Sequence, residues 1–186
     1  MINNDTKIAN QLKAVVIGHA VGDALGVPVE FCSREELKQK PVTDMQGYGT
    51  YPVPAGAWSD DTSMSLAALD SLADGQVDFE EIMTNFVKWI SNDEYTPTGS
   101  AFDVGHTCLC AIRNHLQHPK LPATECGEDG EYANGNGSLI HRDRIYAFAL
   151  LLPSVDGCSY ASRSAFLGRG LPLLLVMRGR SAFVSE

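Results

Sequence analysis

Two adjacent acidic residues between hydroxyl side chains form the segment of this chain best suited to chemistry. The segment Ser59-Asp60-Asp61-Thr62 follows a loop rich in Pro and Gly and opens a helical pattern over residues 63–72. Mg²⁺ and Mn²⁺ favour carboxylate, hydroxyl and water oxygens. The alternative is a helix N-terminus, where Ser, Asp and Thr cap free N–H groups. Two adjacent carboxylates repel each other unless a cation or the helix dipole compensates, so both interpretations stay open.

A second acidic segment precedes it, Gly22–Phe31. Asp23 lies among small apolar residues at a predicted helix end, and Glu30 lies next to Phe31. Partial burial would raise the pKa of Glu30 and suit it to acid–base catalysis. The alternatives are a hydrogen bond at the helix end for Asp23 and an exposed loop position for Glu30.

Two further segments each have an ordinary structural explanation when taken alone. Asp103, in Phe102–Thr107, fits the N-cap of a helix. Asn134–Leu139 is a Gly- and Asn-rich turn before a predicted helix. Such a turn exposes N–H groups that can bind phosphate, although most turns of this composition only reverse the chain.

The elements that must position these side chains are predicted to be helices. Apolar residues recur at helical spacing, and no useful β-alternation appears, so the predicted class is all-α. Gly18, Gly22 and Gly26 recur every four residues and would let another helix or a ligand approach the first helix closely. The first predicted helix spans about 6–25, and a short second helix is capped by Ser33 and Glu36. A third spans 60–73, and a fourth is capped by Asp78 and carries a strong apolar stripe. A fifth starts at Asp103, and a last helical pattern covers 137–152.

Composition narrows the class of protein. The 186 residues are 44% hydrophobic and 20% charged, which is typical of one globular domain with a core. A net charge of −9 argues against nucleic acid or an anionic membrane as partner. The chain has no run of 18 apolar residues and no signal-peptide pattern, so neither a membrane helix nor secretion is expected. Five cysteines outside any CxxC pattern indicate reduced thiols and a cytoplasmic location.

The charge changes sign near residue 140. Residues 141–186 contain six Arg, no Lys and three acidic residues, which leaves 8 basic and 20 acidic residues to residues 1–140. We therefore expect residues 1–140 to form one portion and residues 141–186 an atypical tail. A separate small segment and an out-of-frame or truncated C-terminus both explain this change.

Taken together, the four segments resemble one family. The sequences GDALGVPVEF, WSDDTSM, FDVGHT and GNGSL, in this order and spacing, are similar to those of the ADP-ribosylglycohydrolases, including the dinitrogenase-reductase-activating type. The resemblance covers about residues 10–140. It implies a compact, orthogonal all-α bundle with two Mg²⁺ or Mn²⁺ ions, acting on an ADP-ribosylated protein or a small molecule containing ADP-ribose.

The resemblance also implies roles for individual residues. Ser59, Asp60 and Asp61 would be metal ligands, Glu30 would act at the catalytic centre beside the ribose, and Asp103 would be a cleft carboxylate near metal or substrate. The residues implied for the ADP-ribose pocket are Gly135, Asn136, Gly137 and Ser138. Cleavage at the anomeric carbon passes through an oxocarbenium-like state, for which a positioned carboxylate and a dication are suitable.

The chain departs from the family after GNGSL. The family carries a second metal segment, Asp-x-Asp-Thr/Ser, near its C-terminus, whereas the acidic residues after Asp143 here are Asp156 and Glu186. We therefore expect the C-terminal part of the bundle to be missing. Two function classes stay open: a metal-dependent hydrolase that removes ADP-ribose from protein side chains, and a non-catalytic module or inactive remnant that binds ADP-ribose or an ADP-ribosylated protein.

Overall fold

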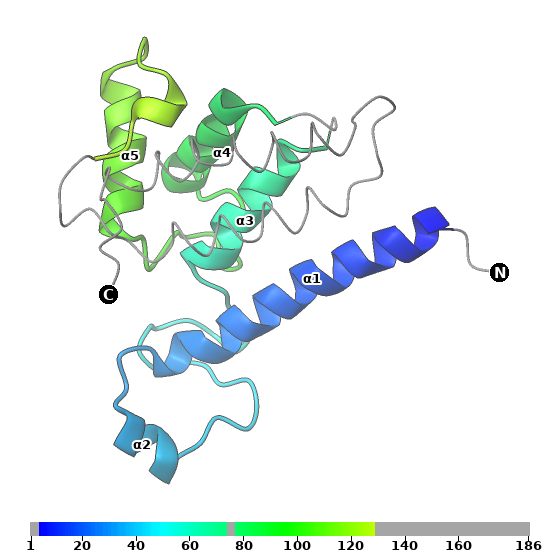
Figure 1. The fold of residues 1–186 in the computed structure, drawn as a ribbon. Coiled ribbons are helices and arrows are strands. Elements are labelled where there is room, and N and C mark those ends of the chain that lie inside the picture. Colours follow the sequence, from blue (N-terminus) through cyan, green and yellow to red (C-terminus); the bar gives the residue numbers. More distant parts are fainter. Residues whose placement is uncertain (1–3, 74–76, 129–186) are drawn as a thin grey trace, which may run out of the picture.

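Helices are the regular elements of the part of the chain that the structure describes. The structure is a computed structural model and describes residues 4–73 and 77–128 (Figure 1). Within these two ranges no strand occurs, which confirms the all-α prediction. The elements are α1 (Asn4–Gly26), the 3₁₀ turn η1 (Val27–Val29), α2 (Arg34–Gln39), α3 (Asp60–Asp70), α4 (Phe79–Asn92), α5 (His106–Gln117) and the 3₁₀ turn η2 (Ala123–Glu125).

The apolar core lies among α3, α4 and α5. The predicted stripe on α4 supplies much of it, since Ile82, Met83 and Phe86 are each about 1% exposed and Trp89 is fully buried. Burial of each such side chain stabilises the fold by about 1.5–3 kcal/mol. The remaining buried members of this cluster are small or flexible: Met64, Ala67, Ala68, Cys108, Ala111, Ile112, Ala123 and Cys126.

Local capping starts two of the helices as predicted. The Ser33 hydroxyl accepts a hydrogen bond from the Glu36 N–H at 3.2 Å, and the Glu36 carboxylate accepts one from the Ser33 N–H at 2.7 Å. This capping box begins α2. The Asp78 carboxylate accepts from the N–H groups of Glu80 and Glu81 and begins α4. Each cap satisfies donors that the first helical turn leaves without a partner.

The prediction that Asp103 caps and starts a helix is wrong. The helix α5 begins at His106, and its N-cap is Gly105, which has no side chain to offer. Asp103 instead adopts the left-handed region with φ of 57°, and its carboxylate accepts a hydrogen bond from the Tyr51 hydroxyl. A tertiary contact across the chain therefore outweighs the local capping preference at this position.

The long helix α1 lies to one side of the α3–α4–α5 cluster and runs well past it (Figure 1). It contacts α3 near its C-terminal end and continues directly into η1. By length and composition alone, residues Ala9–Val29 could cross a membrane. The absence of an uninterrupted apolar run had not indicated this stretch. The same stretch contains His19 and Asp23, whose polar side chains contact α3. The expectation of no membrane partner stays a prediction.

Candidate active site

A single carboxylate joins α1 to the first turn of α3. Asp23 Oδ1 accepts a hydrogen bond from Ser59 Oγ at 2.8 Å. Asp23 Oδ2 accepts from Ser59 N at 3.0 Å, Thr62 N at 3.1 Å and Thr62 Oγ1 at 2.6 Å. Ser59 and Thr62 are both buried, so their N–H and hydroxyl groups depend on Asp23 as hydrogen-bond acceptor. The carboxylate also places its charge at the positive end of the α3 dipole.

One turn before Asp23, His19 adds a second link between the same helices. Its Nε2 lies 3.1 Å from the carbonyl oxygen of Asp61 and 3.3 Å from the hydroxyl of Ser65. Residues four apart share one face of a helix, so His19 and Asp23 both point toward α3. Hydrogen bonds from the start of α3 therefore hold the polar face of α1 in place.

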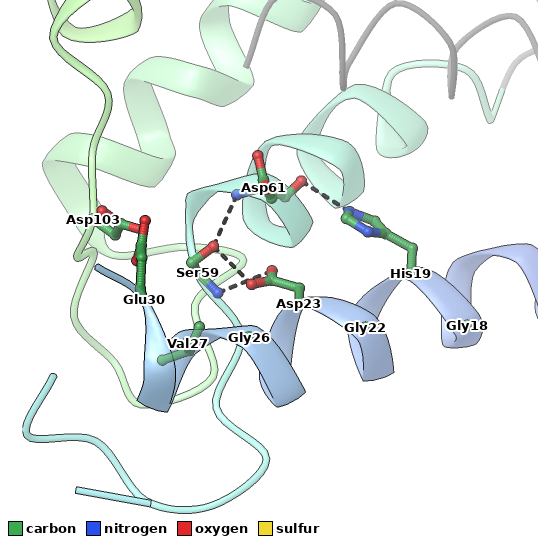
Figure 2. Close-up of a pocket in the computed structure, with 10 residues that line it drawn as sticks. All are labelled: Gly18, His19, Gly22, Asp23, Gly26, Val27, Glu30, Ser59, Asp61 and Asp103. Atoms are coloured by element: carbon green, nitrogen blue, oxygen red, sulfur yellow. Dashed lines mark hydrogen bonds between the residues drawn. The ribbon is translucent and has the colours of Figure 1, made fainter. Parts of the chain in front are cut away.

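The predicted metal-binding segment forms that start of α3, and its three side chains have different surroundings. Ser59 is the N-cap: its hydroxyl donates to Asp23 and accepts from the Asp61 N–H at 3.4 Å. Asp60 accepts a hydrogen bond at 3.2 Å from the N–H of Gly105, just before α5. Asp61 is one of the residues that line the cavity beside α1 (Figure 2). The capping alternative for Ser59 is thus observed, and a capping hydroxyl keeps a lone pair that a cation can use.

Burial and neighbouring negative charges raise the pKa of Asp60 to about 7. Burial is the largest cause, followed by the charge of Asp61, with smaller contributions from Asp103 and Asp23. The Gly105 N–H acts in the opposite direction, because a hydrogen-bond donor favours the charged carboxylate. A carboxylate placed in this way gains much from any cation that enters the site.

Glu30 and Asp103 form a pair of carboxyl groups on the opposite side of Ser59 from His19 (Figure 2). Burial, followed by the hydrogen bond and charge of Asp103, raises the pKa of Glu30 to about 7. This confirms the predicted partial burial of Glu30. The Tyr51 hydroxyl donates to Asp103 Oδ1 at 2.5 Å, and burial together with Asp103 raises the pKa of Tyr51, which keeps its proton. Glu30 can therefore gain or lose a proton near neutral pH.

These side chains line one cavity of about 530 Å³ (Figure 2). Four acidic residues line it, Asp23, Glu30, Asp61 and Asp103, together with Ser59, His19 and Val27. The α1 wall consists of Gly18, Gly22 and Gly26, where an added Cβ would meet no atom within 4 Å. The glycine stripe thus faces open space suited to a ligand, and the volume suits a small-molecule site.

Comparison with known proteins identifies the family to which this chain is similar. The family model of the ADP-ribosylglycohydrolases matches residues 4–167. The chain belongs to the ADP-ribosylglycohydrolase family. The match continues past the change of composition near residue 140. It also includes every residue for which a site role was predicted.

Three curated relatives align with most of the length of this chain. It is 31% identical over 139 residues to the ADP-ribosylarginine hydrolase Tri1 of Serratia proteamaculans and 33% identical over 135 residues to that of Pseudomonas putida. It is 35% identical over 122 residues to the ADP-ribosyl-[dinitrogen reductase] glycohydrolase of Rhodospirillum rubrum. These alignments cover 74%, 70% and 64% of this chain but 36%, 34% and 38% of the relatives. The chain thus spans just over a third of the relatives it matches.

Four of the predicted site residues come together at the cavity, namely Glu30, Ser59, Asp61 and Asp103. Asp60 lies directly beside them, with its carboxylate bonded to Gly105. The predicted ADP-ribose loop falls outside the described residues: Gly135, Asn136, Gly137 and Ser138.

Two cavity or near-cavity residues, His19 and Tyr51, had no predicted role. The spacing of His19 and Asp23, four residues apart with two glycines on the same helix face, is the signal that could have revealed the histidine. Tyr51 lies in a loop, 52 residues before its partner Asp103, and no local pattern indicates that contact. Asp23 was given a helix-end hydrogen bond as one alternative, and it accepts four such bonds from the start of α3.

Proposed function

We propose that this cavity binds the ADP-ribosyl group of a modified protein side chain and that Glu30 carries the proton in hydrolysis of the ribosyl bond. The observation that carries the proposal is the Glu30–Asp103 pair, in which the pKa of Glu30 is raised to about 7 inside an acidic cavity. Membership of the family and the activities of its relatives, an ADP-ribosylarginine hydrolase and an ADP-ribosyl-[dinitrogen reductase] glycohydrolase, support it.

The chemistry follows from the two carboxyl groups. Cleavage at an anomeric carbon builds positive charge on the ribose, which nearby carboxylates stabilise. Glu30 with a pKa of about 7 can take a proton from water or give one to the leaving group at neutral pH. Asp103 accepts a hydrogen bond from the Tyr51 hydroxyl and also makes a side-chain hydrogen bond with Glu30. Tyr51 is thus a positioning residue for the pair.

The residues at the start of α3 fit a hard divalent cation. The donors are all oxygens, and repulsion by Asp61 helps to raise the pKa of Asp60, a penalty that a dication removes. We propose that Asp61, Asp60 and Ser59 contribute ligands to Mg²⁺ or Mn²⁺, with water in the remaining positions. When bound, such an ion would polarise water and hold ribose hydroxyls. The Gly135–Ser138 segment is proposed to bind the diphosphate, as its glycines and N–H groups suit phosphate.

The test is release of ADP-ribose from an arginine-ADP-ribosylated protein by the full chain, with Mg²⁺ or with EDTA. We expect metal-dependent release that falls by at least about 100-fold in Glu30→Gln, because general acid–base groups contribute that much or more. Glu35→Gln is the matched control, since Glu35 is exposed on α2 and distant from the cavity.

Two outcomes would contradict the hydrolase proposal. A cooperatively folded chain that releases nothing but is stabilised by ADP-ribose would be a binding module. Equal loss of release in Glu30→Gln and Glu35→Gln would remove Glu30 from the mechanism. Thermal melts of each variant, with and without ADP-ribose, distinguish these cases from loss of the fold.

A further inference from the structure

A second cluster of possible metal ligands lies on α5, apart from the acidic cavity. The ligand atoms of His106, Cys110 and Glu128 all lie within 4.8 Å of one another. His106 and Cys110 are four residues apart on α5, so their side chains share one face of the helix. The Cys110 Sγ is 3.5 Å from His106 Nε2. None of the three residues lines the cavity described above.

Glu128 closes the cluster from a different part of the chain. It follows η2, and its carboxylate contacts the Cys110 thiol: burial and then the charge and hydrogen bond of Glu128 raise the pKa of that thiol. His106 and Glu128 are exposed and Cys110 is partly buried, so an ion from solvent can reach all three. The cluster therefore joins the first turns of α5 to the segment after η2.

We propose that His106, Cys110 and Glu128 form a three-ligand site for Zn²⁺. Zn²⁺ accepts Cys sulfur at about 2.3 Å and His nitrogen or carboxylate oxygen at about 2.0–2.2 Å, usually in tetrahedral geometry. Three atoms that bind one ion at those distances are less than 4.8 Å apart, which agrees with the separations found in this cluster. Binding replaces the thiol proton of Cys110, which leaves to solvent, and water fills the fourth position.

The donor set distinguishes this site from the proposed Mg²⁺ site. A thiolate and an imidazole are soft or borderline ligands that favour zinc-type ions, whereas Mg²⁺ binds oxygen and keeps much of its water. The cavity offers carboxylates and a hydroxyl, whereas the α5 cluster offers one sulfur, one nitrogen and one oxygen donor. The two proposed sites would therefore bind different ions, Mg²⁺ or Mn²⁺ in the cavity and Zn²⁺ at the α5 cluster.

The competing explanation is a metal-free hydrogen-bonded triad of the same three side chains. Titration of the full, reduced chain with Co²⁺ as a probe for Zn²⁺ separates the two, because a Co²⁺–thiolate bond gives a near-ultraviolet charge-transfer band. We expect a saturable one-to-one band that Zn²⁺ abolishes and that excess Mg²⁺ leaves unchanged. In Cys110→Ser the band should disappear. In His106→Ala and Glu128→Gln the affinity should fall by at least roughly tenfold, since even outer-shell partners of a metal are worth that much.

Controls use the other thiols and histidines. Cys32→Ser removes an exposed cysteine far along the chain and should leave the band intact. His115→Ala tests the other described His–Cys contact, in which His115 Nδ1 lies 3.9 Å from Cys126 Sγ, and should also leave it intact. Absence of the band in the full chain, its persistence in Cys110→Ser, or its loss in Cys32→Ser or His115→Ala would overturn the proposal. Because the readout is metal binding, it is independent of ADP-ribose release.

Discussion

The α3–α4–α5 cluster and helix α1 are held in place by different forces. The cluster is built on buried apolar side chains: Trp89 and Met64 are fully buried, and Phe86 and Ile82 are about 1% exposed. On α1, the large apolar side chains Val15, Ile17 and Val21 are 37%, 61% and 41% exposed. In the described residues, polar bonds from Asp23 and His19 tie α1 to α3.

This contrast shows that the region that stabilises the fold differs from the helix that lines the cavity. The cluster provides a frame whose free energy of unfolding comes from buried apolar area. Helix α1 contributes a wall of the cavity through glycines and two polar side chains. Substitutions in the two regions should therefore differ in both the size and the kind of their effects.

The largest expected effect lies in the core. Phe86→Ala removes a buried ring and should lower the free energy of unfolding by about 3–5 kcal/mol, enough to unfold a marginal domain. Leu116→Ala on α5, where the side chain is 54% exposed, should change it little. Chemical denaturation of both variants gives the comparison. Similar losses for Phe86 and Leu116 would contradict the assignment of the core.

Next in size is the link between the regions. Asp23→Ala leaves the buried donors of Ser59 and Thr62 without their acceptor and should cost about 1–3 kcal/mol. Hydrogen exchange should show faster opening at the start of α3 than in α4. The exposed Glu35→Ala is the control. If the protection of α3 does not change, Asp23 is not what holds α1 against it.

The third effect is a dependence of stability on pH. The folded-state pKa of Asp60, about 7, lies above its ordinary value of 3.8, so the folded chain binds the proton more tightly than the unfolded chain. This contribution is full below the unfolded pKa and is lost as pH rises through about 7. In EDTA, the melting temperature should fall between about pH 5 and pH 8, by the equivalent of about 1–2 kcal/mol. Asp60→Asn should reduce the slope and leave the part due to Glu30, whose pKa is also raised to about 7. An unchanged slope in this variant would contradict the prediction.

The smallest expected effect on stability is at the glycine wall. In Gly22→Ala, the new Cβ meets no atom within 4 Å, and replacing Gly in a helix stabilises it by up to about 1 kcal/mol. ADP-ribose affinity should nevertheless fall several-fold, because the methyl group enters the cavity. In Gly49→Ala the Cβ would clash with the backbone of Pro28, so stability should fall instead. Unchanged ADP-ribose binding in Gly22→Ala would show that this face does not contact ligand.

The sequence predicted the helices well where their signals are local. Ser33 with Glu36, Asp78 with Glu81, and the α4 stripe all act over three or four residues, which is the period of the helix. The acidic character of the site was predicted in the same way, from short segments at helix starts.

Contacts across the chain could not be predicted in this way. Asp103 was expected to cap a helix, but its partner is Tyr51, 52 residues earlier. Asp23 accepts hydrogen bonds from Ser59, the N-cap residue of α3, 36 positions after it, and Glu128 completes a cluster with residues 18 or more positions before it. Such pairings depend on the packing of whole helices, which no local pattern records.

The four carboxylates of the cavity have a consequence for the order in which ligands arrive. Among the described residues that line it, no Lys or Arg offsets Asp23, Glu30, Asp61 and Asp103. A diphosphate approaching at neutral pH would meet a field of its own sign. An anionic ligand should therefore associate slowly with the cation-free chain and quickly once a dication has entered. If the proposed cation and nucleotide both bind in this cavity, the cation would therefore bind first and the nucleotide second.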